Sequence, residues 1–333
     1  FCAQNIRRVV LSREKSINKN HNVDVCILLA TYNGEKYIGE MIDSILNQDY
    51  ENFVIVLSDD ASSDSTPEIL EEYAQRYSQK VILYHSGMHF GCAQKHFMHL
   101  LRQFSDYPHI MFCDQDDIWH KDKISKTMKK MIELEKDNDI SVPILVHTDL
   151  RVVDSNLNEI APSFCKYSNL NGNRLAVNQL LVQNVVTGCT VMINNSLAKL
   201  GCRSFDEDQM LMHDWWLALL AATCGVAAFL DEPTIDYRQH ANNSVGAKNA
   251  KSLRYIVNKL KTAQVANSLQ DTFKNAQTFL KCYHDIIPQK YIYEINAYAN
   301  MENKNALIRK FDYIRYGFWK KGLIREIGQI LLG

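Results

Sequence analysis

The sequence predicts an α/β fold in which a mostly parallel, twisted sheet carries helices on both faces and a helical extension follows at the C-terminus. Three observations predict it. Short segments that are apolar throughout alternate with amphipathic segments of helical period, which is typical of parallel strands buried on both faces. Polar and acidic residues follow several of these apolar segments. From about residue 248 the chain becomes helical and basic.

Four of the expected strands lie in the first part of the chain, at Val25–Ala30, Phe53–Leu57, Val81–Tyr84 and His109–Cys113. Helices are expected between them. The first follows from apolar residues that recur at helical spacing between Ile38 and Leu46. The second opens at Ser65 or Thr66, ahead of Pro67, because proline is tolerated in the first turn of a helix.

The second part of the chain predicts three more strands, at Ile144–His147, Val185–Ile193 and Gly225–Leu230. A helix is expected over His213–Cys224 and a loop over Tyr237–Gly246. The strands end in unusual polar residues, and ligands bind beyond the carboxyl ends of strands in parallel sheets. The pattern therefore predicts a single site at that edge of the sheet.

Composition excludes several classes of protein. The 333 residues carry 37 Lys and Arg against 38 Asp and Glu, so the net charge of −1 gives no reason to expect a nucleic acid partner. The nine cysteines are scattered without a C-x-x-C pair, which indicates free thiols in a reducing compartment. No apolar stretch approaches the ~20 residues of a membrane span or resembles a signal peptide, so we expect a cytoplasmic protein.

An acidic cluster follows the fourth expected strand. Asp114, Asp116 and Asp117 come directly after apolar residues, and three carboxylates so close together stay ionised only with compensation from a cation or several donors. Carboxylate oxygens suit Mg²⁺ or Mn²⁺. The alternative is a solvated turn in which Asp122 caps a helix beginning near Lys123. That alternative explains Asp122 but not the three earlier aspartates, so the sequence predicts a metal site.

The segment Cys113–Trp119, which reads CDQDDIW, resembles the D-x-D motif of inverting family 2 glycosyltransferases, in the version found in rhamnosyltransferase-like members. Four further segments resemble motifs of that family and occur in its order: Val25–Asn33, Ser58–Asp64, His89–Gly91 with Lys95–His96, and His213–Trp216.

The resemblance covers about residues 23–246 and implies a GT-A-like catalytic domain over residues 23–247. Within it, residues 23–120 would form the nucleotide-binding half and residues 121–247 the acceptor half. Residues 1–22 are then a leader segment, and residues 248–333 form a basic helical region.

On the donor side, the resemblance implies that Asp60 receives the N3–H of a uracil or thymine ring while Tyr32 covers the base, with Thr31 and Asn33 in the same loop. Asp60 could instead cap the helix at Pro67, although Ser65 or Thr66 already fits that role. Tyr32 could equally be a packing aromatic. Lys95 would contact phosphate as a point charge where the family more often has Arg-Asn.

The resemblance implies that Asp114 and Asp116 flank the metal, with Asp116 the stronger candidate for direct coordination, while Asp117 could contact the donor sugar. His240 could complete the metal shell or touch phosphate, and Arg238 could offset the charge of the leaving group.

Asp214 is the candidate general base of an inverting displacement. It could also be the N-cap of the helix it opens, and Asp206, Glu207 and Asp208 are nearby alternatives. Gly188 and Trp215 are expected on the acceptor side.

The implied activity is transfer of a sugar, namely rhamnose from dTDP-rhamnose, to a glycan in bacterial surface polysaccharide synthesis. A UDP-hexose or UDP-N-acetylhexosamine transferase is the alternative within the class, and a non-catalytic nucleotide-sugar or glycan-binding protein is the alternative outside it. Cations alternate with aromatic residues between Lys310 and Arg325. That stretch could contact the inner face of the membrane, where a lipid-linked glycan would be the acceptor, or could simply pack on the domain.

Overall fold

The computed structural model describes residues 23–203, 205, 207–240 and 262–322. The leader segment, the boundary expected at residues 247 and 248, and the end of the basic region lie outside these residues.

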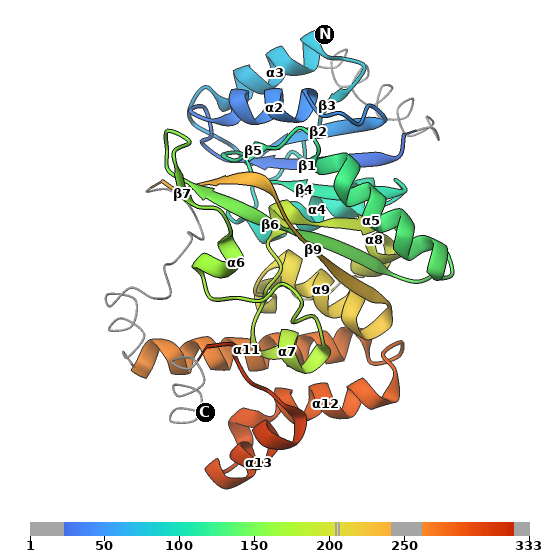
Figure 1. Ribbon diagram of the computed structural model, residues 1–333, viewed down its shortest axis with the longest axis vertical. Coiled ribbons are helices and arrows are strands. Elements are labelled where there is room, and N and C mark those ends of the chain that lie inside the picture. Colours follow the sequence, from blue (N-terminus) through green and yellow to red (C-terminus); the bar gives the residue numbers. More distant parts are fainter. Residues whose placement is uncertain (1–22, 204, 206, 241–261, 323–333) are drawn as a thin grey trace.

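One nine-stranded sheet runs through the molecule in the order β3-β2-β1-β4-β8-β6-β9-β5, with β7 paired to β6 (Figure 1). The first four strands are β1 (Val25–Thr31), β2 (Phe53–Asp59), β3 (Val81–Leu83) and β4 (His109–Cys113). They pair in parallel, so the carboxyl ends of β1, β2 and β4 lie at one edge. These four strands confirm the expected first part of the sheet.

The sheet continues through strands of both directions: β5 (Ile118–Trp119), β6 (Ile144–Val153), β7 (Glu159–Ala161), β8 (Met192–Asn194) and β9 (Val226–Arg238). Strand β8 is antiparallel to both β4 and β6, whereas β6 and β9 run parallel. The short strand β5 pairs antiparallel with the end of β9, which brings the segment after the acidic cluster against that strand.

Two expected segments were wrong in detail. Most of Val185–Ile193 is not a strand, because it holds the 3-10 helix η1 (Gly188–Thr190), and β8 begins only at Met192. An apolar run signals burial rather than strand geometry, and Val185 and Val186 are indeed buried outside the sheet. The strand expected to end at Leu230 continues to Arg238, because β9 pairs with β6 past two irregularities and then with β5.

Helices cover both faces of the sheet, as expected (Figure 1). They are α2 (Ile38–Leu46), α3 (Thr66–Arg76), α4 (Ala93–Phe104), α5 (Lys123–Asp137), α6 (Phe164–Tyr167), α7 (Val177–Val182), α8 (Asn195–Gly201) and α9 (His213–Cys224), with the 3-10 helix η2 (Glu207–Gln209). Apolar side chains of α2 and α5 form a core on one face, and those of α4 and α9 form a core on the other. This arrangement leaves the strand ends open for a site.

The C-terminal helices are α11 (Thr262–Tyr283), α12 (Gln289–Ala299) and α13 (Ala306–Tyr316), with the 3-10 helix η3 (Met301–Asn303). They pack on the side of α9 that faces away from the sheet (Figure 1). Trp216 of α9 lies between Phe205, at a ring-centroid distance of 4.4 Å, and Phe279 of α11, at 5.2 Å. The C-terminal helices therefore share a core with the sheet domain.

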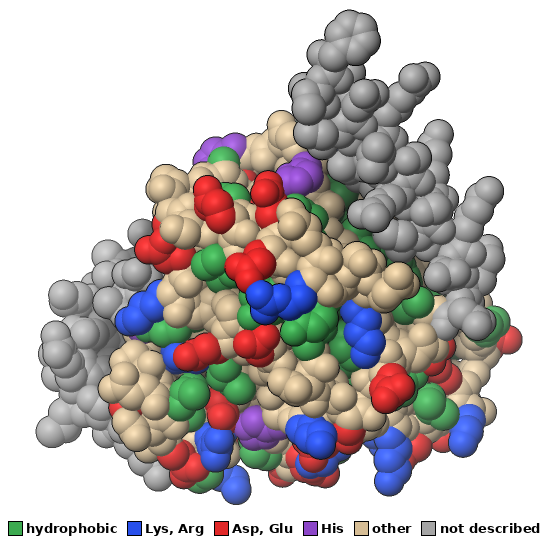
Figure 2. All heavy atoms as spheres, turned by 90° about the horizontal axis from the view of Figure 1, so that it is seen from above, with side chains coloured by type: hydrophobic (Ala, Val, Ile, Leu, Met, Phe, Trp, Pro, Cys, Tyr) green, Lys and Arg blue, Asp and Glu red, His purple; other side chains and the backbone are tan. Residues whose placement is uncertain are grey.

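Surface charge in the described ranges is mixed. Figure 2 shows acidic and basic side chains interspersed over the face seen from above, without an extended basic patch among them. This agrees with the balanced composition. None of the helices in the described ranges combines the length and apolar character needed to cross a bilayer.

Candidate active site

A cavity of about 700 Å³ opens at the carboxyl ends of β1 and β4. Eight of the predicted site residues line it: Thr31, Tyr32, Asp60, Asp114, Asp116, Gly188, Asp214 and Trp215. Asn33, Lys95, Asp117, Arg238 and His240 are not among the lining residues. The structure thus brings residues from both halves of the chain to one cavity.

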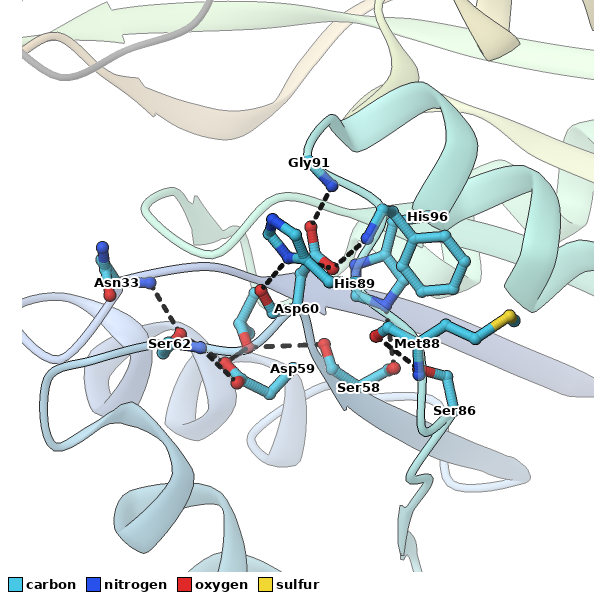
Figure 3. Close-up of polar contacts among 12 residues, drawn as sticks. Asn33, Ser58, Asp59, Asp60, Ser62, Ser86, Met88, His89, Gly91 and His96 are labelled. Carbon is cyan, nitrogen blue, oxygen red and sulfur yellow. Dashed lines mark hydrogen bonds and ion pairs between the residues drawn. The ribbon is translucent and has the colours of Figure 1, made fainter.

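The loop after β2 is held to the loop after β1 by hydrogen bonds (Figure 3). Asp59 accepts from the Thr31 hydroxyl at 2.9 Å and from both the backbone N–H and the hydroxyl of Ser62, at 2.8 and 2.5 Å. Asn33 has a φ of 48° and donates its backbone N–H to the Ser62 hydroxyl at 2.8 Å. The hydrogen bonds of Asn33 therefore join the two loops.

Asp60 holds the segment that begins at His89. Its carboxylate, on a residue only 4% exposed, accepts the backbone N–H groups of Phe90 at 2.6 Å and Gly91 at 2.9 Å (Figure 3). His89 Nδ1 lies 3.2 Å from the same carboxylate. Each carboxylate oxygen can accept two hydrogen bonds, so one acceptor direction stays available on the Gly91 side.

The helix-cap alternative for Asp60 is wrong. Helix α3 begins at Thr66 with Ser65 in the N-cap position, and the Thr66 N–H donates to Asp64 at 3.0 Å. The base-binding role of Asp60 stays a prediction.

Tyr32 and His89 stand beside each other at the cavity, with ring centroids 6.4 Å apart and planes tilted by 45°. Tyr32 is 53% exposed, so it is not a packing aromatic of the core. Two exposed rings at a cavity can cover a planar ligand. The sequence alone did not single out His89 for this place.

Gln115 joins the acidic cluster to the loop after β1, a role that sequence reasoning missed. Its amide oxygen accepts the Tyr32 N–H at 2.8 Å, and its amide nitrogen donates to the Tyr32 carbonyl at 3.0 Å. A Cβ at Gly34 would collide with the Gln115 amide oxygen, so a larger residue there would displace the Gln115 side chain. The amide between two aspartates in the D-Q-D-D segment was the available signal.

Of the clustered aspartates, Asp117 is buried, Asp114 and Asp116 are partly buried, and all three receive few hydrogen bonds. Burial, followed by the charges of Asp116 and Asp214, raises the pKa of Asp114 to about 7. Asp117 is fully buried, and its Oδ1 accepts the Arg238 N–H at 3.1 Å, while its Oδ2 has no hydrogen-bond partner in the described structure. Burial, with Asp116 and Asp114 adding to it, also raises the pKa of Asp117. In the described part of the chain, few hydrogen-bond donors compensate these carboxylates.

Two sets of candidate ligands lie at this cluster. His240 Nε2 is 2.8 Å from Asp116 Oδ2, so the structure brings together two of the three predicted metal ligands. The second set consists of Asp114, Asp117 and Cys189, whose ligand atoms lie within 4.8 Å of one another. Carboxylate and imidazole donors fit a divalent cation, and the partnerless buried oxygen of Asp117 is what such an ion would satisfy.

Lys123 lies behind the cluster and was also missed. The residue is fully buried at the start of α5, its ammonium group is 4.6 Å from the centre of the Trp119 ring, and burial lowers its pKa to about 8. Its Nζ has no hydrogen-bond partner in the part of the chain that the structure describes. The start of α5 at Lys123 is as expected, and Asp122 at the N-cap position pairs with Lys126 instead of capping with its side chain.

Arg238 and Lys95 are each paired with an acid that does not line the cavity. The Arg238 guanidinium is 3% exposed, binds Glu40 at 2.6 Å and donates to the Asp116 carbonyl at 2.9 Å, so it fixes the backbone of the acidic cluster. Lys95 forms an ion pair with Asp208. The adjacent His96 lines the cavity and bonds Ser58 at 2.8 Å. Contacts of Arg238 and Lys95 with a donor stay predictions.

Asp214 lies opposite the acidic cluster, in the first turn of α9. The N-cap position belongs to Met212, so the alternative that Asp214 caps the helix is wrong. Its carboxylate accepts from the Asn184 amide at 3.1 Å and from the Trp215 N–H at 2.5 Å. Burial nevertheless raises the pKa of Asp214 to about 6. A carboxylate with that pKa suits proton transfer near neutral pH.

Gly188 is needed for the packing around Asp214. A Cβ there would lie 2.9 Å from His213 Nε2 and 3.5 Å from Asp214 Oδ2. Trp215 also lines the cavity and donates its indole N–H to the Leu180 carbonyl at 2.5 Å. Both residues therefore line the cavity next to Asp214, and their contact with an acceptor stays a prediction.

The other acids near Asp214 are engaged elsewhere. Glu207 pairs with Arg102 and Asp208 with Lys95, and neither acid lines the cavity. Asp206 lies outside the described residues. This leaves Asp214 as the candidate base on its side of the cavity.

Comparisons with known proteins agree with this geometry. The family model of glycosyl transferase family 2 matches residues 26–201. The dTDP-rhamnosyl transferase RfbG of Shigella flexneri is 32% identical to this chain over 75% of its length and 87% of the relative. The putative teichuronic acid biosynthesis glycosyltransferase TuaG of Bacillus subtilis is 26% identical over 69% of this chain and 84% of the relative.

Solved structures show the same fold at low identity. A structure of S. aureus TarS in complex with UDP matches with a TM-score of 0.52 and 16% identity, covering 89% of this chain and 93% of that one. The mannosyltransferase PcManGT from Pyrobaculum calidifontis, in complex with GDP-Man and Mn²⁺, matches with a TM-score of 0.53 and 18% identity, covering 91% and 79%. The fold is therefore GT-A-like.

Proposed function

The chain belongs to glycosyl transferase family 2, and we propose that it transfers rhamnose from dTDP-rhamnose to a glycan of a bacterial surface polysaccharide, with inversion at the sugar. One observation carries the proposal. A single cavity is lined by Asp60 after β2, by Asp114 and Asp116 after β4, and by Asp214 at the start of α9. These carboxylates supply a contact for the base, a place for a cation and a proton acceptor.

In the proposed reaction, Asp60 accepts a ring N–H of the base, and Tyr32 covers the ring. Asp117 would contact the donor sugar, and Lys95 and Arg238 would contribute positive charge toward the phosphates. Asp114, Asp116 and His240 would hold Mg²⁺ or Mn²⁺, which supplies neutralisation of the diphosphate charge when it is bound. The raised pKa values of Asp114 and Asp117, and the Asp117 oxygen that has no hydrogen-bond partner among the described residues, support the assignment of a cation to the cluster.

Asp214 then takes the proton of the acceptor hydroxyl, whose oxygen forms the new bond to the anomeric carbon as the bond to the diphosphate breaks. Its raised pKa, about 6, gives the carboxylate the basicity for this step while leaving it ionised at neutral pH. Gly188 and Trp215 line the acceptor side.

The proposal assigns residues 23–120 to donor binding and residues 121–247 to acceptor binding. The proposed transfer takes place at the cytoplasmic side of the membrane, where nucleotide sugars are made. A lipid-linked glycan is one form that the acceptor could take.

Donor identity is tested by thermal shift with dTDP-rhamnose, UDP-glucose and UDP-N-acetylglucosamine, each with and without Mn²⁺. We expect the largest stabilisation from dTDP-rhamnose with Mn²⁺, because a ligand that binds only the folded chain raises its melting temperature. Greater stabilisation by a UDP-sugar would replace rhamnose with the UDP-hexose or UDP-N-acetylhexosamine alternative. No stabilisation by any of these nucleotides would contradict donor binding.

Catalysis is tested with Asp214→Asn, using Asp137→Asn, at the exposed end of α5, as the matched control outside the cavity. We expect Asp214→Asn to lower transfer by about a thousandfold while the shift caused by the donor is kept, and Asp137→Asn to leave transfer near that of the unaltered protein. Donor binding without transfer in the unaltered protein, across a panel of glycan acceptors, would favour the non-catalytic alternative.

A further inference from the structure

Helix α13 exposes large apolar side chains to solvent. Leu307 is 81% exposed, Phe311 60% and Ile314 72%, and Ile308 beside them is 48% exposed. Residues 307, 311 and 314 are spaced by four and three positions, so they share one face of the helix. We call these four residues the α13 face. An exposed cluster of this kind indicates a surface that contacts something else.

The opposite side of α13 is fixed to the protein. Tyr313 is 1% exposed, and Asp312 is buried and paired with Lys304 at 2.7 Å. Phe318, just beyond the helix, is fully buried. The aromatic residues Tyr313 and Phe318 of the basic stretch are therefore core residues, contrary to a membrane role for the whole stretch. The α13 face is exposed because the helix has a second, separate apolar side.

Cations border the α13 face. Lys310 follows Leu307 by three positions and Arg315 follows Phe311 by four, so the two cations lie on opposite edges of the apolar stripe. Both are exposed. The acidic residue of the helix, Asp312, is turned inward and already paired. An apolar strip edged by long cationic side chains fits the boundary between lipid chains and anionic headgroups.

A second copy of the chain fits the α13 face less well. A twofold contact places each residue near its own counterpart or that of a neighbour. Lys310 and Arg315 would then approach their own copies, and α13 offers no free acid to offset them. Anionic lipid supplies the charge that a second copy of this helix lacks.

We propose that the α13 face docks this protein on a membrane surface that contains anionic lipid. Figure 1 places α13 at the opposite end of the molecule from α3, so docking there leaves the nucleotide-binding half away from the surface. The proposal does not depend on which sugar is transferred, because it concerns only contact with lipid.

The first test measures sedimentation of the full chain with vesicles of phosphatidylcholine, with and without phosphatidylglycerol. We expect binding to the vesicles that contain phosphatidylglycerol. The triple variant Leu307→Ser, Phe311→Ser, Ile314→Ser should bind at least about tenfold more weakly. Ile140→Ser is the control, because Ile140 is 94% exposed on the loop after α5. Binding of the triple variant equal to that of the control would overturn the proposal, as would failure of the unaltered chain to bind.

The second test separates charge from apolar contact. Lys310→Gln with Arg315→Gln should weaken binding to the phosphatidylglycerol vesicles by about tenfold and reduce its sensitivity to salt. Lys129→Gln, on the exposed side of α5, is the control and should change neither. All these side chains are exposed, so circular dichroism should show unchanged folding. A dimer in light scattering that the triple variant dissociates, without vesicle binding, would assign the α13 face to a second copy and overturn the proposal.

Discussion

Two groups of aspartates stand at the carboxyl ends of β2 and β4, the strands on either side of β1, and they differ in the hydrogen-bond donors that the chain supplies. Asp59 and Asp60, at the end of β2, receive hydrogen bonds from hydroxyl and backbone N–H groups across two loops. Asp117, after β4, is buried and Asp114 is partly buried, both have raised pKa values, and one oxygen of Asp117 has no hydrogen-bond partner in the described structure. The fold supplies several hydrogen-bond donors to the first group and few to the second.

The difference shows that aspartates at equivalent strand ends can have opposite effects: one group stabilises the fold, and the other destabilises it but is available to bind a ligand. The aspartates after β2 stabilise their own loops, so their removal should unfold or loosen structure. The aspartates after β4 cost folding free energy by their mutual repulsion, so their removal should spare the fold and abolish function. Substitutions in the two groups therefore test this difference.

The largest expected effect is that of Asp116→Asn on transfer. Loss of this carboxylate should lower the rate by about a thousandfold and remove the response to Mn²⁺, because one ligand charge is gone. Folding stability of the metal-free protein should change by less than about 1 kcal/mol. Initial rates, a Mn²⁺ titration and urea unfolding check this. Asp122→Asn, which breaks only a surface pair with Lys126, is the control, and unchanged Mn²⁺ affinity in Asp116→Asn would contradict the assignment.

The next effect is on the pH dependence of turnover. The pKa of Asp214 is raised to about 6, and a carboxyl group accepts a proton only when it is ionised. Turnover should therefore be level above that pH and fall by about tenfold for each pH unit below it. A plot of log kcat against pH at saturating donor and Mn²⁺ measures the limb. A rate that stays level to pH 5 would exclude Asp214 as the base.

A smaller effect, on stability, is expected from Asp60→Ala. The substitution removes the acceptor of the partly buried N–H groups of Phe90 and Gly91, which should cost about 1–3 kcal/mol of unfolding free energy. Urea denaturation measures it. Asp106→Ala is the control, because the Asp106 side chain is 94% exposed, and it should cost less than about 0.5 kcal/mol. Equal losses of unfolding free energy in the two variants would refute the idea that the Asp60 carboxylate stabilises the fold.

The smallest expected effect is that of Gln115→Ala, which removes the hydrogen bonds between the acidic cluster and the loop after β1. Loss of the paired hydrogen bonds to Tyr32 should raise the KM for the donor by about three- to tenfold, while kcat stays within about twofold. Steady-state kinetics separates the two constants. Gln75→Ala, on the exposed side of α3, should alter neither, and a fall in kcat alone would point to a role in the chemical step instead.

The sequence predicted the strands and strand ends of the first half because their signal is local. Runs such as Val25–Ala30 are apolar throughout and stop at polar turns, and that pattern is readable in a few residues. The apolar run Val185–Ile193 carried the same signal without being a strand. Its burial comes from packing rather than from sheet pairing, and periodicity does not distinguish the two.

Eight of the residues expected at the site line one cavity, whereas the partners of the other expected residues were not predicted. Asp214 and the acidic cluster were identified by the order of motifs, yet the bond of Arg238 to Glu40 joins residues 198 positions apart and leaves no local pattern. The same holds for Lys95 with Asp208. Gln115 and Lys123 were not predicted because their roles depend on contacts with Tyr32 and Trp119, which no sequence pattern shows.

The paired hydrogen bonds between Gln115 and Tyr32 have a consequence for how a donor would be measured. If the base binds beside Asp60 and the diphosphate beside Asp116, the nucleotide is a bivalent ligand with two subsites. The paired hydrogen bonds between Gln115 and Tyr32 then help to fix the distance between these subsites. Binding of the base then raises the effective concentration of the diphosphate at its own subsite, and the reverse holds as well. The nucleoside alone and pyrophosphate alone should each bind weakly, and their affinities should multiply only in molecules whose linker matches that spacing.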